Sequence, residues 1–379
     1  MTIRRALIVE GPLLPSQAAH WSAFADLDVD LHMVGGLSAP GDDWWTTGET
    51  ADITTHVMRP RGWVKRGQHW WIYPGLSDLI RRLKPDVVHV GAEPWALFYS
   101  QVLPVGIPTV GHGADNIWIH GGLVETRLRT ARARSVLKRL SGYASWNTAG
   151  IRLAENFGFP AEGPTLVAPN RIPDPQPFED AARRRTEHRV ELGISDKTVV
   201  GYVGRLVPEK GLDWLIEAMA RVVIPGTLLL IVGSGPSQVR YEQMARDLGV
   251  AARFTGGVPP ERMPAIMASC DVLVVPSLTM PAWAEQFGRV VTEAMFAHTP
   301  VISSDSGSLP EVIGDAGLLV REDDRAQLAA AIRSLATNDD LRHSLGDRGW
   351  SRALQEYGPT PLARRLLMFW NDAVAFEVT

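Results

Sequence analysis

Short β-branched runs alternate with helical patterns along almost the whole chain, and this alternation limits the possible folds more than any other feature. The first half contains the strand-like runs RRALIV, VDLHMV, ITTHVM, DVVHV, IPTVGH, YASWN and TLVAPN. The second half contains TVVGYVGR, LLLIVGSG, ARFTGG, DVLVVPS, PVISSDS and GLLV. Nearly continuous apolar strands separated by helices are typical of parallel sheets that are covered on both faces. Two such blocks predict an α/β protein with two doubly wound, Rossmann-like domains.

The length of 379 residues is too great for one hydrophobic core, so two domains are expected. A proline-rich segment, APNRIPDPQPFEDAARRR, separates the two blocks of strands. Prolines so close together continue neither a helix nor a central strand. We therefore predict an N-terminal domain over residues 1–174, a C-terminal domain over 175–355 and a final amphipathic helix within 356–379. The alternative is that the proline-rich segment is only a long surface loop.

The composition is that of an ordinary globular protein, with 45% hydrophobic and 21% charged residues. The net charge of −4 gives no reason to expect a nucleic-acid partner. Cys270 is the single cysteine, which excludes an intrachain disulfide and a cysteine-based metal site and fits a reducing cytosol. No apolar run approaches the ~20 residues of a membrane span. We therefore expect a cytoplasmic protein, at most peripheral to the inner face of the membrane.

The segment GYVGRLVPEKGLDWL places two cations after a predicted strand. The strand is expected to end at Gly204, the loop carries Arg205 and Lys210, and a helix is expected to begin near Gly211. Ligands of open α/β sheets bind at the carboxyl ends of the strands, and two cations beside a helix N-terminus suit a diphosphate. The alternative is that both cations are simply solvated loop charges.

The segment LLLIVGSGPSQ contains only part of a dinucleotide-binding fingerprint. Gly233 and Gly235 predict a tight turn between a strand and a helix, but Gln238 occupies the place of the third glycine. An NAD site is therefore weakly supported, and the chain has no Walker A motif that would indicate a P-loop.

The segment PAWAEQFGRVVTEAMFAHTP holds Glu285 and Glu293 in surroundings that are otherwise mostly apolar. Glutamate is rarely buried without a partner. A helix that begins near Gly288 would place Glu285 at its mouth and Glu293 two turns in, with free backbone N–H groups between them. Two carboxylates around an anion site match the order of a sugar, a diphosphate and a ribose. The alternative is that Glu293 pairs with a cation in the core.

Three segments together resemble one family. GRLVPEKG, TGGVPPERMPAIMASCDVLVVPS and AEQFGRVVTEAMFAHTPVISSDSGSLPEV look like the glycogen-synthase-like retaining glycosyltransferases of family GT4, which have the GT-B fold. Two glutamates separated by seven residues are the signature of that family. The resemblance extends from about Thr198 to Val320 and is weaker in the N-terminal half. It implies that the final helix returns to the N-terminal domain.

The resemblance also implies roles for individual residues. Arg205 and Lys210 would bind the donor diphosphate, Glu293 the ribose hydroxyls and Glu285 the hydroxyls of the transferred sugar. His112 would contact the donor sugar, unless it is an ordinary histidine at a strand end. The other implied donor-site residues are Gly204, Gly257, Val258, Gln286, Phe287, Gly288 and Arg289.

The implied mechanism places the donor in the C-terminal domain and the acceptor in the N-terminal domain, with a cleft that closes over both. The departing phosphate would take the proton of the acceptor, with retention of the anomeric configuration. No cofactor and no metal are expected, because Arg205 and Lys210 would neutralise the diphosphate. A nucleotide sugar would be the co-substrate, with a UDP-sugar as first choice and GDP-mannose as second.

The acceptor site is less clearly indicated. Many relatives have a glycine-rich loop after the first strand, where this chain offers only Gly11. Exposed aromatic side chains suit sugars, aglycones or lipids, but tryptophan is also often buried. The candidate acceptor residues are Gly11, Trp44, Trp45, Trp70 and Trp71, and Trp63 belongs to the same cluster.

The segment ETRLRTARARSVLKRL predicts a basic helix that extends over Arg127–Arg139. It is interpreted either as a solvated charged face or as a weak contact with an anionic membrane. A soluble natural product or a saccharide therefore competes with a lipid-linked acceptor.

Other classes of protein remain possible at this point. The main alternative is a nucleotide-sugar 2-epimerase of GT-B fold, and an NAD-dependent oxidoreductase or a sugar-binding protein without activity is less favoured. The oligomeric state is left open by the sequence.

Overall fold

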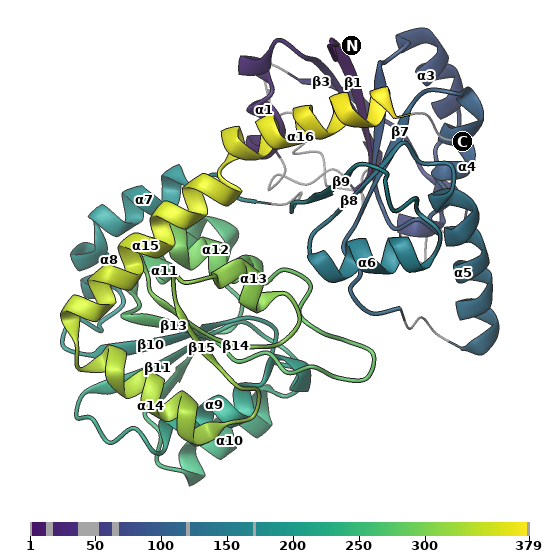
Figure 1. Ribbon diagram of the computed structural model, residues 1–379. Helices are drawn as coiled ribbons and strands as arrows, with labels where there is room; N and C mark the ends of the chain where they lie inside the picture. The colour runs from purple at the N-terminus through teal and green to yellow at the C-terminus, as the bar shows by residue number, and fades with distance from the viewer. Residues whose placement is uncertain are drawn as a thin grey trace. The chain divides into compact units, whose positions relative to one another are not determined.

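The computed structural model describes residues 2–12, 18–36, 53–62, 68–118, 122–169 and 172–376. The chain divides into two compact units. The first contains the residues up to Pro173 and those from Pro359 onward, and the second contains Asp174–Gly358 (Figure 1). Trp44, Trp45 and Trp63 lie outside the described residues, as do residues 170 and 171 of the proline-rich segment.

The first unit contains a parallel sheet of seven strands in the order β3-β2-β1-β6-β7-β8-β9. The strands are β1 (Arg5–Pro12), β2 (Asp30–Gly36), β3 (Ile53–Val57), β6 (Val87–Gly91), β7 (Thr109–Gly113), β8 (Gly142–Ser145) and β9 (Thr165–Val167). All seven coincide with the runs expected from the sequence. A short antiparallel pair, β4 (Arg61–Gly62) and β5 (Trp71–Ile72), was not anticipated.

Helices cover both faces of this sheet, which explains why its strands are apolar on both sides. They are α1 (Ala18–Ser22), α3 (Leu76–Leu83), α4 (Tyr99–Val102), α5 (Leu123–Leu137), α6 (Thr148–Asn156) and α16 (Pro359–Ala375), with 3₁₀ turns η2 (Ala25–Leu27), η4 (Gln68–Trp70) and η5 (Leu103–Val105). The C-terminal helix α16 packs Phe369 and Trp370 into the same core as Ile8 of β1. The Arg365 guanidinium also donates to the Val167 carbonyl at 2.6 Å. The last helix of the chain is therefore a structural part of the first unit.

The second unit contains a parallel sheet of six strands in the order β12-β11-β10-β13-β14-β15. They are β10 (Thr198–Val203), β11 (Thr227–Val232), β12 (Ala252–Phe254), β13 (Val272–Val275), β14 (Val301–Ser304) and β15 (Leu318–Val320). The helices are α7 (Gln176–Arg183), α8 (Arg185–Glu191), α9 (Leu212–Met219), α10 (Gln238–Asp247), α11 (Met263–Ser269), α12 (Arg289–Phe296), α13 (Leu309–Ile313), α14 (Arg325–Ala336) and α15 (Asp339–Tyr357), with turns η6 (Pro208–Lys210) and η7 (Pro260–Arg262). Two doubly wound parallel sheets confirm the predicted fold class.

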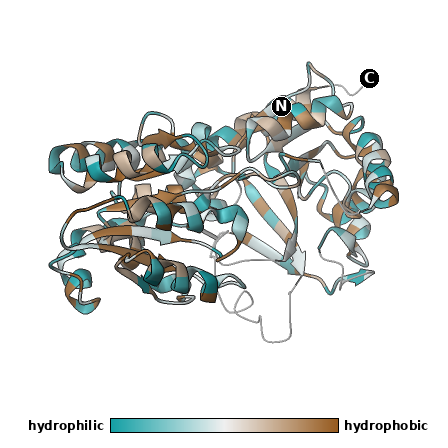
Figure 2. Ribbon diagram, turned by 90° about the horizontal axis from the view of Figure 1, so that it is seen from below, coloured by the Kyte–Doolittle hydropathy of each residue, from teal (hydrophilic) through white to brown (hydrophobic). Residues whose placement is uncertain are grey.

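Hydrophobic residues gather on the strands and on the helix faces that pack against them, whereas the outer helix faces are largely hydrophilic (Figure 2). Among the described residues, no helix combines the length and the apolar character needed to cross a membrane.

Candidate functional site

The strand order of the second unit reverses between β10 and β13. These two strands pair with each other, and the chain continues from β10 to β11 on one side and from β13 to β14 on the other. Such a reversal opens a crevice at the carboxyl ends of the two strands, where ligands of doubly wound sheets bind. The loop after β10 carries Arg205 and Lys210, and the loop after β13 carries Glu285. The topology therefore brings the charged residues of two distant motifs to one edge of the sheet.

Gly233 and Gly235 allow the loops after β10 and β11 to pack closely. Gly233 has φ of +136°, and a Cβ atom there would lie 1.9 Å from the carbonyl oxygen of Gly204. A Cβ atom at Gly235 would lie 2.4 Å from the carbonyl oxygen of Leu206. Because both glycines are required by contacts between protein loops, their presence is explained without a dinucleotide.

Lys210 and Glu285 form the centre of the candidate site. The Lys210 ammonium donates to Oε2 of Glu285 at 2.5 Å, and the Ser277 hydroxyl donates to the same oxygen at 2.8 Å. The Lys210 ammonium also lies 4.7 Å from the centroid of the Trp283 ring. Glu285 is only 8% exposed, so this ion pair lies in surroundings that screen it weakly. Ser277 and Trp283 were missed by the sequence reasoning.

The main chain around Glu285 is held in place by the loop after β14. The backbone N–H of Ser308 donates to the Glu285 carbonyl at 3.0 Å, and the Ser308 hydroxyl donates to it at 3.1 Å. Gly307 has φ of +54°, and a Cβ atom at this position would lie 2.2 Å from the Glu285 carbonyl oxygen. The segment that carries Glu285 is therefore packed directly against backbone, and only glycine fits at residue 307.

Helix α12 begins at Arg289, in agreement with the expected start near Gly288, and Gly288 is its N-cap in the left-handed region at φ of 72°. Glu285 precedes the helix, and Glu293 lies about one turn inside it rather than two. The expected two turns correspond to the whole interval from Glu285 to Glu293, and a start at Gly288 would already have placed Glu293 only about 1.4 turns inside the helix. The first N–H groups of α12 have no acceptor within the helix, which leaves a positive electrostatic potential at its mouth.

Glu293 has a cation partner on its own helix. Nε of Arg289 lies 3.2 Å from Oε1 of Glu293, and the Arg289 side chain is 53% exposed whereas that of Glu293 is 13% exposed. Burial raises the pKa of Glu293 above its ordinary value, and Arg289 opposes that rise. The alternative anticipated from the sequence, a cation partner, is thus present, but the partner extends from the surface rather than from the core.

The remaining donor-site candidates differ in what they expose. Phe287 buries its ring against Tyr357, with the ring centroids 5.4 Å apart, so only its backbone is free to contact a ligand. Arg205 is exposed and forms an ion pair with Glu209 at 3.5 Å. Gly204 donates its N–H to the Val232 carbonyl. Val258 packs beside one core of the unit. Space around a Cβ atom at Gly257 is nearly open, with the Ser234 hydroxyl nearest at 3.9 Å, while Gln286 is half-buried.

His112 lies on β7 of the first unit, where both of its ring nitrogens are engaged. The Trp370 indole N–H donates to Nδ1 of His89 at 3.1 Å, so Nε2 of His89 carries the proton that faces Nδ1 of His112 at 3.0 Å. Nε2 of His112 then donates to the Ala168 carbonyl at 2.8 Å. Burial lowers the pKa of His112 to about 4, although its bond to Ala168 favours the proton. His112 is therefore a neutral ring at the end of a hydrogen-bonded chain.

The described acceptor candidates are mostly packed against protein. A Cβ atom at Gly11 would lie 2.4 Å from the side-chain oxygen of Gln68. Trp71 is 5% exposed and belongs to the core. Trp70 is half-buried, with its ring centroid 5.9 Å from that of Trp95.

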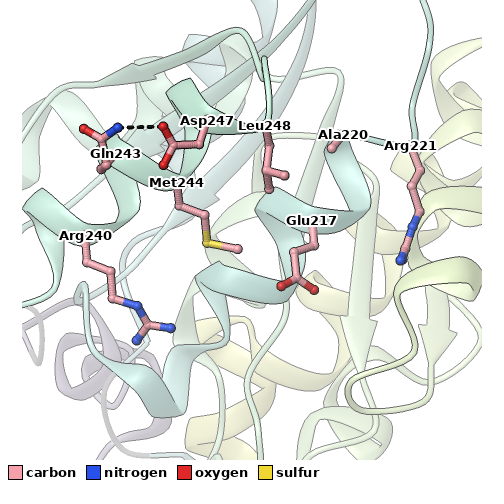
Figure 3. A pocket seen from close by; sticks show the side chains of 8 residues that line it. All are labelled: Glu217, Ala220, Arg221, Arg240, Gln243, Met244, Asp247 and Leu248. Carbon is pink, nitrogen blue, oxygen red and sulfur yellow. Dashed lines mark hydrogen bonds between the residues drawn. The ribbon is translucent and has the colours of Figure 1, made fainter.

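A separate hollow of about 720 Å³ lies over α9 and α10 of the second unit (Figure 3). It is lined by Glu217, Ala220, Arg221, Arg240, Gln243, Met244, Asp247 and Leu248. None of these is a residue of the candidate site, so the chemistry-bearing residues do not coincide with this hollow.

Comparison with known proteins identifies the family. The model of the family described as glycosyl transferases group 1 matches residues 184–352. The 2-deoxystreptamine glucosyltransferase of Streptomyces kanamyceticus is 30% identical over 285 residues, which are 69% of this chain and 72% of that protein. The chain belongs to the group 1 glycosyltransferases. This membership confirms the resemblance inferred from the sequence.

Two other relatives match this group 1 glycosyltransferase over less than two thirds of their own length. A GDP-mannose-dependent alpha-(1-6)-phosphatidylinositol monomannoside mannosyltransferase of Mycolicibacterium smegmatis is 34% identical, over 59% of this chain and 62% of that protein. A D-inositol 3-phosphate glycosyltransferase of Corynebacterium aurimucosum is 33% identical, over 60% of this chain and 55% of that protein.

Solved structures match both units of this group 1 glycosyltransferase. Anabaena Alr3699/HepE in complex with UDP has a TM-score of 0.74 at 20% identity, over 96% of this chain and 98% of that one. WaaG, a glycosyltransferase of lipopolysaccharide biosynthesis, has a TM-score of 0.63 at 18% identity, over 96% and 98%. The fold is therefore GT-B. The region matched by the family model contains Lys210, Glu285 and Glu293, whereas His112 lies outside it.

Proposed function

We propose that this chain is a retaining glycosyltransferase that transfers a hexose-type sugar from a nucleotide sugar to a hydroxyl group. The observation that carries the proposal is the buried carboxylate of Glu285, which the Lys210 ammonium holds at 2.5 Å beside the mouth of α12. A cation, a helix N-terminus and an oriented carboxylate are the groups required by a diphosphate attached to a sugar.

In this proposal the Lys210 ammonium, which pairs with Glu285 in the absence of a ligand, also pairs with the diphosphate when the donor binds. Arg205, which is exposed and only loosely paired, adds a second cation. Negative charge develops on the leaving phosphate in the transition state, and cations already in place stabilise it without reorganisation. No metal is then required for this step, and we expect chelation with EDTA to leave turnover unchanged.

Glu285 and Glu293 would bind the two ends of the donor. Glu285, released in part by Lys210, accepts hydrogen bonds from the hydroxyls of the transferred sugar. Glu293 accepts hydrogen bonds from the ribose, and Arg289 swings from it toward the phosphates, since that side chain is already half in solvent. The N–H groups of Phe287 and Gly288 contact the phosphates. Gly257 and Val258 would lie near the base, and Gly204 would belong to the same donor site.

His112 is proposed to contact the donor sugar as a neutral ring. Its Nε2–H already donates to the Ala168 carbonyl, so a sugar hydroxyl would have to take over that donor. The acceptor would bind to the first unit, and its hydroxyl would attack on the face from which the phosphate departs. The phosphate would take the proton, so no enzyme nucleophile is required.

The names of relatives support two donors and a class of acceptors. A UDP-sugar is our first choice and GDP-mannose the second. One relative is named GDP-mannose-dependent, and one structural neighbour was solved with UDP. The three relatives described above are named for acceptors that contain a cyclitol, namely 2-deoxystreptamine, inositol phosphate and a phosphatidylinositol mannoside. Soluble and lipid-linked cyclitols are therefore the first acceptors to assay, followed by other saccharides and natural products.

Calorimetric titration of the full chain with UDP, GDP, ADP, dTDP and their sugars tests the donor site. Glu293→Ala is expected to weaken binding of the preferred nucleotide about 10- to 100-fold, because hydrogen bonds to a charged group contribute ~1.5–3 kcal/mol. Glu261→Ala, which removes an exposed carboxylate of the same unit, is the matched control and should bind as the wild type does. If Glu293→Ala binds every nucleotide with the same affinity as the wild type does, the ribose assignment is refuted.

The competing activities have their own readouts. A 2-epimerase would convert the donor without any acceptor, and an oxidoreductase would change the absorbance of NADH. Failure of all nucleotides to bind the wild type would refute the proposed function as a whole.

A further inference from the structure

Helix α5 (Leu123–Leu137) of the first unit exposes apolar side chains that a soluble helix normally buries. Leu123 is 82% exposed, Val124 73% and Leu128 67%. All three lie within six residues at the start of the helix. An exposed apolar group of this kind marks a binding surface more often than an isolated exposed residue does.

The exposed residues of α5 share one face. At about 100° per residue, the exposed positions from Leu123 to Ser135 fall within an arc of roughly 140°. These positions are Leu123, Val124, Arg127, Leu128, Ala131, Arg134 and Ser135. The apolar side chains and two cations, Arg127 and Arg134, are therefore presented together, and the exposed Lys138 and Arg139 continue the charge beyond the helix end.

The opposite face anchors the helix on its unit. Ala133, Val136 and Leu137 are buried in the core. The Arg132 guanidinium donates to the Trp95 carbonyl at 2.8 Å and to the Ala96 carbonyl at 3.1 Å. The six cations of the basic segment thus separate into two groups, because Arg129 and Arg132 face inward.

Arg129 further shows that the inner cations have protein partners. Its guanidinium lies 3.9 Å from the centroid of the Trp95 ring and forms an ion pair with Glu125. Glu125 is the single carboxylate of α5, and its pairing with Arg129 leaves the outer face without an acidic side chain. The outer face is consequently apolar and cationic, on a helix whose inner face is packed into the core of its unit.

We propose that the outer face of α5, formed by Leu123, Val124, Arg127, Leu128 and Arg134, binds the surface of an anionic lipid bilayer. The charge of the face selects this occupant. Apolar side chains enter the boundary between headgroups and acyl chains, while neighbouring cations attract anionic headgroups. A second copy of the chain on a two-fold axis would instead place cations against cations. The inference is independent of the proposed sugar transfer.

Co-sedimentation of the full chain with vesicles tests this inference. We expect binding to vesicles of phosphatidylcholine and phosphatidylglycerol in equal amounts, weakened by added salt, and little binding to phosphatidylcholine alone. The double variant Leu123→Ser/Leu128→Ser should bind about tenfold more weakly or worse. The variant Arg127→Gln/Arg134→Gln should lose about fivefold per cation on anionic vesicles.

Val223→Ser/Val239→Ser is the matched control, because these side chains are equally exposed but belong to the second unit. It should bind vesicles as the wild type does. Circular dichroism and the melting temperature should remain unchanged in all three variants, since every altered side chain is exposed.

Absence of wild-type binding to anionic vesicles would overturn the proposal. Equal losses in the α5 variants and the control would also overturn it. A change of molecular mass in solution with the α5 variants and no vesicle binding would indicate a second copy of the chain instead. Nucleotide titration of the α5 variants should be normal, which separates this test from that of the proposed function.

Discussion

Replacement of His20 by phenylalanine is expected to stabilise the first unit. The His20 side chain is fully buried, and among the described residues neither ring nitrogen has a hydrogen-bond partner. Its ring packs against Trp21 with the centroids 4.4 Å apart, so an aromatic ring suits the position. Burial, with a smaller effect of the nearby His112, lowers the pKa of His20 from 6.5 to about 3.

The size of the effect follows from the two lost penalties. Each unpaired buried polar atom costs ~1 kcal/mol or more, and slight overpacking by phenylalanine offsets part of the gain, so we expect a net gain of ~1 kcal/mol at pH 7.5. Because the folded pKa of His20 is depressed, the stability of the neutral ring is present above pH 6.5 and is lost as the pH falls toward 3. Between pH 6.5 and 5 the wild type loses ~2 kcal/mol through this proton alone. The advantage of His20→Phe should therefore grow to ~3 kcal/mol at pH 5.

Urea unfolding followed by tryptophan fluorescence measures this difference. Nine of the 13 tryptophans precede residue 150 and Trp370 also belongs to the first unit, so the signal reports mainly on that unit. His343→Phe, at an exposed position of the second unit, is the matched control and should show no growing advantage. An advantage that stays constant between pH 7.5 and 5 would refute the buried neutral ring. A loss of more than ~2 kcal/mol at pH 7.5 would show that the His20 nitrogens have a partner.

Three further substitutions test the second unit by urea unfolding. Lys210→Met should cost ~3 kcal/mol, because it leaves the buried carboxylate of Glu285 without its cation, and added Glu285→Gln should recover at least ~1 kcal/mol; additive losses would refute the coupling. Gly307→Ala should cost ~2 kcal/mol or more, because its Cβ atom would meet the Glu285 carbonyl at 2.2 Å, whereas Gly193→Ala, with φ of +62° and open space, should cost only ~1 kcal/mol. Asp271→Asn should cost ~3 kcal/mol, since this carboxylate is 14% exposed and binds Arg185 at 2.7 Å as well as a second arginine; an unchanged midpoint would show that the arginines find other acceptors.

Most of the fold could be predicted from the sequence, because each strand has a local pattern of apolar and β-branched residues. All thirteen expected strands are present, since apolar β-branched runs between helices have few alternatives. The short pair β4–β5 was not predicted, because strands of two residues show no periodic pattern in the sequence. Helix α12 begins next to its expected start near Gly288, but the sequence does not show that Gly288 takes a left-handed conformation or that a Cβ atom there would meet the Leu309 side chain at 2.5 Å.

The charged residues of the candidate site could be predicted from the sequence, but the contacts between them could not. Glu285, Glu293 and Lys210 stood out as charges within or beside apolar segments. Ser277 carries no such signal, because a serine after a strand is common. The basic segment of α5 likewise gave no separation of its cations, since apolar residues lie on both faces of that helix.

The sequence by itself determined the two doubly wound domains and the positions of the glutamate pair. Apolar runs indicate the strands, and Glu285 and Glu293 are distinguished by the mostly apolar segment around them. Only the tertiary structure decided that Lys210 meets Glu285 across 75 positions of the chain, and that Arg289 is the partner of Glu293. It also decided that His112 ends a chain of hydrogen bonds that begins at Trp370. These contacts depend on which strands become neighbours and which helix faces are covered, and neither property belongs to any one segment of the sequence.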